Sequence, residues 1–194
     1  MSCLLKNITD HIPCDAIAGG TNVMVSAVVS DSRKIQPGAL FVAVKGLHYD
    51  GHDFIEMAIE KGATSIICEN LPGETPPGVS FIKTPDSAHA LGMASGIFFG
   101  NPSHHVKLVG ITGTNGKTST ATLLYEAFRD LGYKTGLIST VRILSDNEEI
   151  ESTHTTPDPI TLNALLKKML DMNCSHVFME VSSHAVVQKR IAGL

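Results

Sequence analysis

The residues best suited to chemistry form one short glycine-rich segment, Gly113-Thr-Asn-Gly-Lys-Thr-Ser119. Gly113 and Gly116 let the backbone turn tightly and present its N–H groups to an anion, and a helix after them adds unpaired N–H groups and a positive dipole end. Lys117 can offset the charge of the β- and γ-phosphates, and the hydroxyl of Thr118 suits Mg²⁺. The segment therefore predicts a phosphate loop that binds ATP with Mg²⁺.

All seven residues of this loop are expected to contact the nucleotide: Gly113, Thr114, Asn115, Gly116, Lys117, Thr118 and Ser119. The loop is a variant, because the general pattern asks for glycine at the position of Ile111. The alternative interpretation is a glycine-rich turn with a surface lysine. The position of the glycine-rich segment between an apolar strand and an amphipathic helix favours nucleotide binding.

A second segment, which carries an acidic residue, supports the same chemistry. The run Val177-Phe-Met-Glu-Val181 is apolar and carries Glu180 at the carboxyl end of an expected strand, where ligands of open α/β sheets collect. A carboxylate is a hard oxygen ligand for Mg²⁺. We expect Lys117 and Glu180 to be catalytic and Thr118 and Glu180 to hold the metal; the alternative for Glu180 is a solvated carboxylate at a strand end.

The elements around these residues alternate between strands and helices, which predicts a parallel sheet covered by helices. A polar hairpin is expected at 141–151. The expected strands are 107–112, 135–139 and 176–181, and the expected helices are 117–131 and 159–172, with a further helical segment after 181.

The front of the chain predicts a small mixed α/β domain. Asp53 is the expected N-cap of the first helix and Gly62 its end signal, and turn residues at 100–105 indicate a boundary. We therefore predict domains at 1–103 and 104–194, the second of them part of a parallel-sheet phosphate-loop domain. The expected front strands are 25–30, 40–44, 65–68 and 81–83, and the expected helices are 54–59 and 86–99.

Composition narrows the class of protein. The chain has 194 residues, 43% hydrophobic and 18% charged, with a formal net charge of -4 and no basic run, so neither nucleic acid nor a membrane is an expected partner. The four cysteines show no metal-ligand spacing, and the N-terminus lacks a signal-peptide core. We expect a cytoplasmic protein. About 90 residues are few for a doubly wound domain, so we also expect a fragment.

Several segments together resemble the Mur ligases, which extend the peptide of UDP-N-acetylmuramic acid. The phosphate loop looks like theirs, and the set Glu180-Val-Ser-Ser-His-Ala185 is similar to the MurE branch, whereas the MurF branch normally carries a Gly-Ala-Asn type sequence there. The other segments that carry the resemblance are Asp31-Ser-Arg33, Pro37-Gly-Ala-Leu-Phe-Val-Ala43, Asp50-Gly-His52, Thr153-His-Thr-Thr-Pro157 and Gln188-Lys-Arg190.

The resemblance implies site residues beyond the phosphate loop. Ser32 would contact the uridine nucleotide, with the loop Gly46–Asp50 nearby. Hydroxyls, an amide and a guanidinium suit sugar, peptide and acidic groups. The residues that would hold the muramoyl-dipeptide are Thr155, Thr156, Ser182, Gln188 and Arg190.

The resemblance also implies an activity. ATP would activate the terminal carboxylate of UDP-N-acetylmuramoyl-L-alanyl-D-glutamate as an acyl phosphate, and the amine of meso-diaminopimelate or L-lysine would attack it. A carbamylated lysine and a third, C-terminal ligase domain are implied beyond Leu194, so residues 1–194 alone are expected to be inactive. The alternatives are a MurF-type ligase, a phosphate-loop kinase or GTPase, and a non-catalytic nucleotide-binding module.

Overall fold

The computed structural model describes residues 1–46, 49–145, 148–151 and 155–194, so Leu47, His48, Asp146, Asn147, Ser152, Thr153 and His154 lie outside the described residues. The chain forms two compact units, Met1–Phe98 and Phe99–Ala192. Both units are α/β, and the expected fold class is confirmed. Within the described ranges, no helix is long and apolar enough to span a bilayer.

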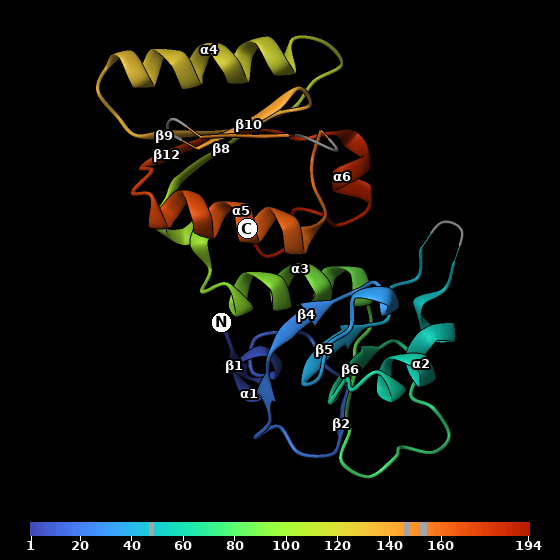
Figure 1. Ribbon diagram of the computed structural model, residues 1–194. Coiled ribbons are helices and arrows are strands. Elements are labelled where there is room, and N and C mark those ends of the chain that lie inside the picture. Colours follow the sequence, from blue (N-terminus) through green and yellow to red (C-terminus); the bar gives the residue numbers. More distant parts are fainter. Residues whose placement is uncertain (47–48, 146–147, 152–154) are drawn as a thin grey trace. The chain divides into compact units, whose positions relative to one another are not determined.

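The first unit is built on a five-stranded sheet (Figure 1). Four of its strands are parallel, and the edge strand β2 runs antiparallel to β7. Their order is β2 (Ala16–Ala18), β7 (Ser80–Lys83), β6 (Ser65–Cys68), β5 (Ala39–Val42) and β4 (Ala27–Val29), and a two-stranded ribbon joins β1 (Cys3–Leu4) to β3 (Met24–Val25).

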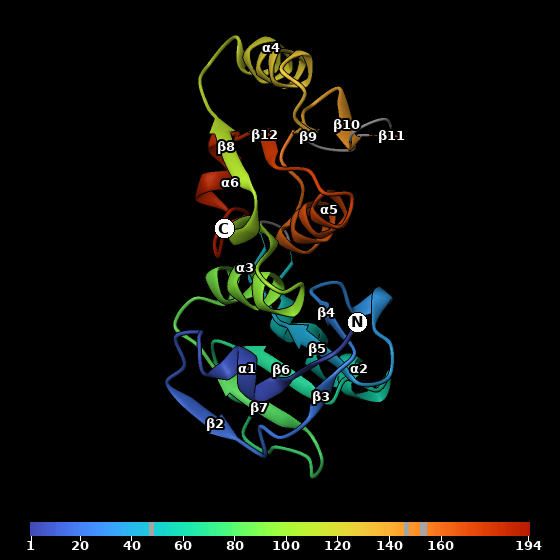
Figure 2. The ribbon, with the colours of Figure 1, turned by 90° about the vertical axis from the view of Figure 1, so that its left-hand side faces the viewer.

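Three α-helices accompany this sheet: α1 (Leu5–Thr9), α2 (Ile55–Glu60) and α3 (Ser87–Phe98). Ile55 and Ala58 of α2 pack on Phe41 and Ile66, and α3 lies against β4, β5 and β6 (Figure 2). Burial of these apolar side chains is the main force holding the helices to the sheet.

The expected N-cap of α2 is wrong. A 3₁₀ turn, η2 (Gly51–Phe54), precedes the helix, and the carboxylate of Asp50 caps that turn by accepting a 3.0 Å hydrogen bond from the backbone N–H of His52. Because the cap belongs to the turn, none of the described side chains caps α2 itself, and Asp53 lies within the turn. Gly62, with φ of 96°, ends the helix as expected.

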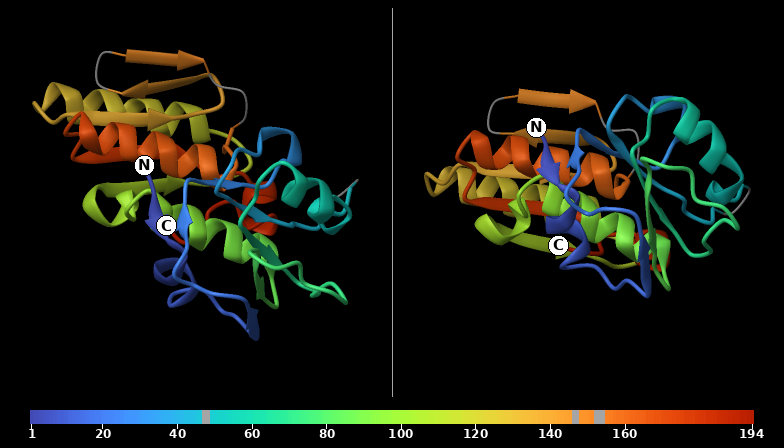
Figure 3. Two further views of the ribbon diagram at one scale, coloured as in Figure 1. Left: turned by 60° about the horizontal axis from the view of Figure 1, so that its bottom comes forward. Right: turned by 90° about the horizontal axis from the view of Figure 1, so that it is seen from below.

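The second unit has a five-stranded sheet of order β11-β10-β9-β12-β8. The parallel strands are β8 (Lys107–Ile111), β12 (His176–Glu180) and β9 (Thr135–Ile138). The expected hairpin is confirmed as β10 (Arg142–Ser145) and β11 (Glu148–Glu151), which continue the sheet in antiparallel fashion (Figure 3). A 3₁₀ turn, η3 (Pro102–His105), leads into β8.

Helices cover both faces of this second sheet. The helix α4 (Lys117–Asp130) lies on one face, and α5 (Pro159–Asp171) and α6 (Ser183–Val187) lie on the other (Figure 1). On β12, Phe178 packs with Tyr125 of α4, whereas Val177 and Met179 pack with α5. Successive side chains of a strand alternate between faces, so Glu180 shares the α4 face with Phe178.

Candidate functional site

The phosphate loop follows β8 and leads directly into α4. Gly116 has φ of 82°, a left-handed conformation that glycine adopts without steric cost, and α4 begins at the next residue. The amine of Lys117 donates hydrogen bonds to the carbonyl oxygens of Gly113, at 2.7 Å, and Thr114, at 3.4 Å. The cation therefore lies against the loop that would receive the phosphates.

The carboxylate of Glu180 is buried, with 1% of the residue exposed, and both of its oxygens accept hydrogen bonds. Oε1 accepts from the backbone N–H of Thr140 at 2.8 Å. Oε2 accepts from the hydroxyl of Thr118 at 3.0 Å and from the hydroxyl of Thr140 at 3.2 Å. These three bonds offset the cost of removing a carboxylate from water.

Strand order explains why these side chains meet. β12 lies between β8 and β9 and is parallel to both, so the carboxyl ends of all three strands share one edge of the sheet. Glu180 pairs in register with Ile111, the last residue of β8, and Thr140 follows β9 by two residues. Three segments far apart in sequence thus converge at this edge.

A cavity of about 600 Å³ opens at the same edge. It brings together five of the sequence-predicted loop and metal residues with two predicted substrate residues, Thr155 and Ser182. Four further residues line it to which the sequence analysis assigned no role in the site: Thr112, Thr140, Ser183 and His184. The full lining is Thr112, Gly113, Thr114, Lys117, Thr118, Thr140, Thr155, Glu180, Ser182, Ser183 and His184.

The oxygen atoms of this cavity fit Mg²⁺ held with a phosphate. Glu180 is the only carboxylate among the lining residues, and in the described part of the chain no three His, Cys, Asp or Glu side chains cluster as a metal site. Mg²⁺ commonly takes one or two carboxylates together with substrate phosphates and water, rather than an all-protein cage. Thr118 and Glu180 match that requirement.

The predicted substrate residue Thr156 has a different environment from Thr155. It is 1% exposed, and its hydroxyl donates to the carbonyl oxygen of Glu180 at 2.9 Å and accepts from the N–H of Ser182 at 3.1 Å. These bonds tie the loop before α5 to the turn after β12. The Thr156 side chain is thus engaged within the protein, outside the cavity lining.

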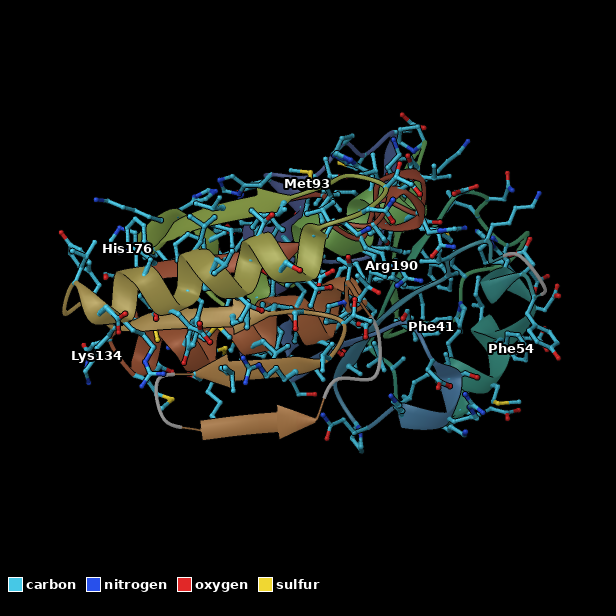
Figure 4. The ribbon with its side chains drawn as sticks, turned by 90° about the horizontal axis from the view of Figure 1, so that it is seen from above. Phe41, Phe54, Met93, Lys134, His176 and Arg190 are labelled. Atoms are coloured by element: carbon cyan, nitrogen blue, oxygen red, sulfur yellow. The ribbon has the colours of Figure 1, made fainter. Side chains whose placement is uncertain are left out.

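Arg190 and Gln188 extend this internal network. Nη1 of Arg190 donates to the carbonyl oxygen of Thr156 at 2.7 Å, and its Nε and Nη2 donate to Oε1 of Gln188 at 2.9 and 2.7 Å. Between them, Lys189 adopts φ of 56°, a left-handed conformation uncommon outside glycine and asparagine. Figure 4 shows Arg190 at the end of the sheet where α4 begins, with His176 at the other end.

The first unit has its own cavity, of about 550 Å³. Ser32, predicted to contact uridine, lines it and is 8% exposed. Asp31 and Arg33 are charged residues of this lining. The apolar side chains of the same lining suit a flat aromatic ring. The full lining is Ser30, Asp31, Ser32, Arg33, Val44, Tyr49, Gly51, Phe54 and Met57.

Asp31 and Arg33 form a two-pronged ion pair in this lining. Oδ1 of Asp31 accepts from Nε of Arg33 at 2.9 Å and from its backbone N–H at 3.0 Å, and Oδ2 accepts from Nη2 at 2.8 Å. These hydrogen bonds from Arg33 lower the pKa of Asp31 to about 2. The carboxylate thus fixes a guanidinium that can present its remaining N–H groups to an anion.

Two protein-family models match this chain. The Mur ligase middle domain matches residues 111–194, and the Mur ligase family catalytic domain matches residues 24–98. Together they cover both cavities described above.

Individual relatives agree with the family models. The chain is 54% identical over 190 residues to the UDP-N-acetylmuramoyl-L-alanyl-D-glutamate--2,6-diaminopimelate ligase of Bacteroides fragilis, covering 98% of this chain and 39% of that protein. It is 51% identical to the ligase of the same name from Cytophaga hutchinsonii, with the same coverage. The chain thus spans about 39% of the length of these curated relatives.

Solved structures match the fold. A structure named UDP-N-acetylmuramoyl-L-alanyl-D-glutamate--2,6-diaminopimelate ligase superposes with a TM-score of 0.80 at 23% identity, covering 100% of this chain and 39% of that one. MurF from Acinetobacter baumannii superposes with a TM-score of 0.65 at 18% identity, covering 94% and 36%.

Proposed function

Because this chain belongs to the Mur ligase family, we propose that it holds ATP and a UDP-linked muramoyl peptide for an ATP-dependent ligase of peptidoglycan synthesis. The reaction adds 2,6-diaminopimelate to UDP-N-acetylmuramoyl-L-alanyl-D-glutamate, as the names of the relatives state for those proteins. In this proposal residues 1–103 bind the UDP end of the substrate and residues 104–194 bind ATP. The reaction takes place in the cytoplasm.

One observation carries the proposal: the phosphate loop, the Glu180 carboxylate and the hydroxyls of Thr155 and Ser182 line the same cavity. A ligase must bring the γ-phosphate of ATP to the carboxylate of its substrate, because proximity and orientation supply much of the rate. A nucleotide-binding module would need only the loop. The shared cavity supports a site in which phosphoryl donor and acceptor meet.

The chemistry proceeds in two displacements. An oxygen of the substrate carboxylate attacks the γ-phosphorus and ADP leaves, giving an acyl phosphate. The amine of diaminopimelate then attacks the acyl carbon and loses a proton, and inorganic phosphate leaves with the C–O electron pair. Phosphate is a far better leaving group than oxide, so ATP makes amide formation possible.

The chain's own groups act by positioning and by offsetting charge. Loop N–H groups and the amine of Lys117 stabilise charge that spreads over the phosphoryl oxygens during transfer. Thr118 and Glu180 would hold Mg²⁺, which supplies further charge neutralisation when bound. Thr155 and Ser182 hold the peptide that carries the acceptor carboxylate, and the network of Thr156, Gln188 and Arg190 keeps the loops of these two residues in place.

In the first unit, the proposal assigns the cavity around Ser32 to the uridine nucleotide. Phe54, Met57 and Tyr49 supply apolar and aromatic surface for the base, and Ser32 supplies a hydroxyl. Arg33, held by Asp31, suits an anionic group such as the diphosphate.

A coupled assay of ADP release tests the proposal on the complete protein. We expect release that requires ATP, UDP-N-acetylmuramoyl-L-alanyl-D-glutamate and diaminopimelate together, with a product whose mass has increased by one diaminopimelate residue. GTP and L-lysine should be poor replacements. ADP release that is independent of the UDP-linked peptide would overturn the proposal. Residues 1–194 alone are expected to bind ligands without ligating them.

A further inference from the structure

We propose that Thr140 is a positioning residue: it orients the Glu180 carboxylate for Mg²⁺ and sets the direction of the Thr155 hydroxyl proton. This inference rests on the proposed function, because it concerns how the same cavity holds the metal–nucleotide complex. Thr140 follows β9, lines the cavity and touches both Glu180 and Thr155.

Thr140 forms hydrogen bonds to both oxygens of the Glu180 carboxylate. Its backbone N–H donates to Oε1 at 2.8 Å, and its hydroxyl donates to Oε2 at 3.2 Å. Rotation of the carboxylate plane would therefore break two hydrogen bonds to one residue at once. Oε2, which also accepts from Thr118, is thereby held toward the first turn of α4, where a metal at Thr118 would lie.

The turn after β9 explains why the backbone N–H of Thr140 is available. The N–H and the hydroxyl of Ser139 donate to the carbonyl oxygen of Arg142 at 3.1 and 2.8 Å, and the N–H of Arg142 donates back to the Ser139 hydroxyl at 3.2 Å. Ser139 and Arg142 thus close the turn on themselves. The N–H of Thr140, inside that turn, is left to bind Glu180.

The hydroxyl of Thr140 also fixes a proton direction. Its oxygen lies 3.0 Å from the hydroxyl oxygen of Thr155, and it has a single proton to donate. A carboxylate oxygen can only accept, so Thr140 donates to Glu180 and Thr155 donates to Thr140. The lone pairs of the Thr155 hydroxyl oxygen then remain to accept a hydrogen bond. Thr155 therefore binds an N–H or a hydroxyl of the substrate in preference to a carboxylate or phosphate oxygen.

The test compares Thr140→Val with Thr140→Ser in the complete protein. Valine keeps the shape and the backbone N–H but removes the hydroxyl, whereas serine keeps it. Calorimetric titration would measure the affinity for a non-hydrolysable ATP analogue across Mg²⁺ concentrations and in EDTA. Thr120→Val, at an exposed position of α4, is the matched control.

We expect Thr140→Val to raise the Mg²⁺ concentration for half-maximal binding by about 10-fold or more, as for other partners of metal ligands. Binding in EDTA should stay near wild type, because loop N–H groups and Lys117 remain. Thr140→Ser and Thr120→Val should behave like the wild type. An unchanged Mg²⁺ requirement in Thr140→Val, or an equal loss with and without metal, would overturn the inference.

A second variant keeps the inference testable if Thr140→Val does not fold. Thr155→Val removes the donor to Thr140 but leaves every hydrogen bond to Glu180. It should weaken binding of the UDP-linked peptide without changing the Mg²⁺ requirement; a shift in that requirement instead would contradict the proton direction. If the wild-type protein shows no Mg²⁺-dependent ATP binding, the proposed function itself fails.

Discussion

The hydroxyl of Thr118 donates a 3.0 Å hydrogen bond to Oε2 of Glu180, across 62 positions of the sequence. One residue lies in the first turn of α4 and the other ends β12, so this bond joins the phosphate loop to the middle one of the three parallel strands. A hydroxyl and a carboxylate oxygen at this separation are neighbours that a Mg²⁺ ion could share.

Glu180→Gln should weaken Mg²⁺-dependent ATP binding by roughly 10- to 100-fold, because an amide keeps the shape of the side chain but loses its charge. Nucleotide binding in EDTA should change little. Titration calorimetry with and without metal measures both quantities. Glu126→Gln, an exposed position on α4, is the control and should match the wild type. Equal Mg²⁺ affinity in Glu180→Gln and wild type would exclude Glu180 as a ligand.

Lys117→Met should lower the rate of ADP formation by about 10²- to 10³-fold, as removal of a preorganised charge-stabilising group commonly does. Methionine keeps most of the length of the side chain but cannot donate to a phosphate. Lys134→Met serves as control, because Lys134 lies at the opposite end of the sheet (Figure 4). Single-turnover measurements at saturating ATP would show the difference, and comparable rates for the two variants would contradict the assigned role.

Much of this site could be predicted from local sequence. The phosphate loop and Glu180 have signatures that short windows reveal: glycine spacing before an amphipathic helix, and an apolar run ending in an acid. Thr140 has no such signature, since a single threonine after a strand is ordinary. Its only signal was its place after one of three predicted parallel strands, whose carboxyl ends share an edge.

Short elements were harder to predict than long ones. The helix α1 spans only Leu5–Thr9, too few residues for a 3.6-residue period to show. The 3₁₀ turn η2 precedes the helix α2, so the capping residue is Asp50 rather than the predicted Asp53. The buried state of Thr156 could not be read either, because Thr155 and Thr156 are identical in type and only the tertiary contacts separate them.

The pKa of Asp31 should be visible in a pH titration. Arg33 lowers it from 3.8 to about 2, so the stabilisation from this pair is present above about pH 4 and is lost as the pH falls through about 2. Carbon NMR of the Asp31 carboxyl would give the midpoint directly. In Arg33→Gln the midpoint should rise toward 3.8; an unchanged midpoint would show that Arg33 is not the cause.

Gly51→Ala should destabilise the first unit and weaken binding of a uridine nucleotide. A Cβ at Gly51 would lie 2.6 Å from the backbone nitrogen and 2.7 Å from the carbonyl oxygen of Val44, so the backbone itself must shift. A loss of about 1–3 kcal/mol in the free energy of unfolding is typical of such overpacking. Gly73→Ala, with open space around its Cβ, is the control for urea unfolding and UDP titration. Equal stability of the two variants would contradict the steric account.

The position of β12 between β8 and β9 has a consequence for biosynthesis. During translation β8, the phosphate loop and β9 leave the ribosome before β12, yet β8 and β9 pair with β12 rather than with each other. The phosphate loop can therefore contact Glu180 only after β12 has inserted between β8 and β9. Tight binding of the metal–nucleotide complex would thus begin only when β12 has completed the parallel part of the nascent sheet.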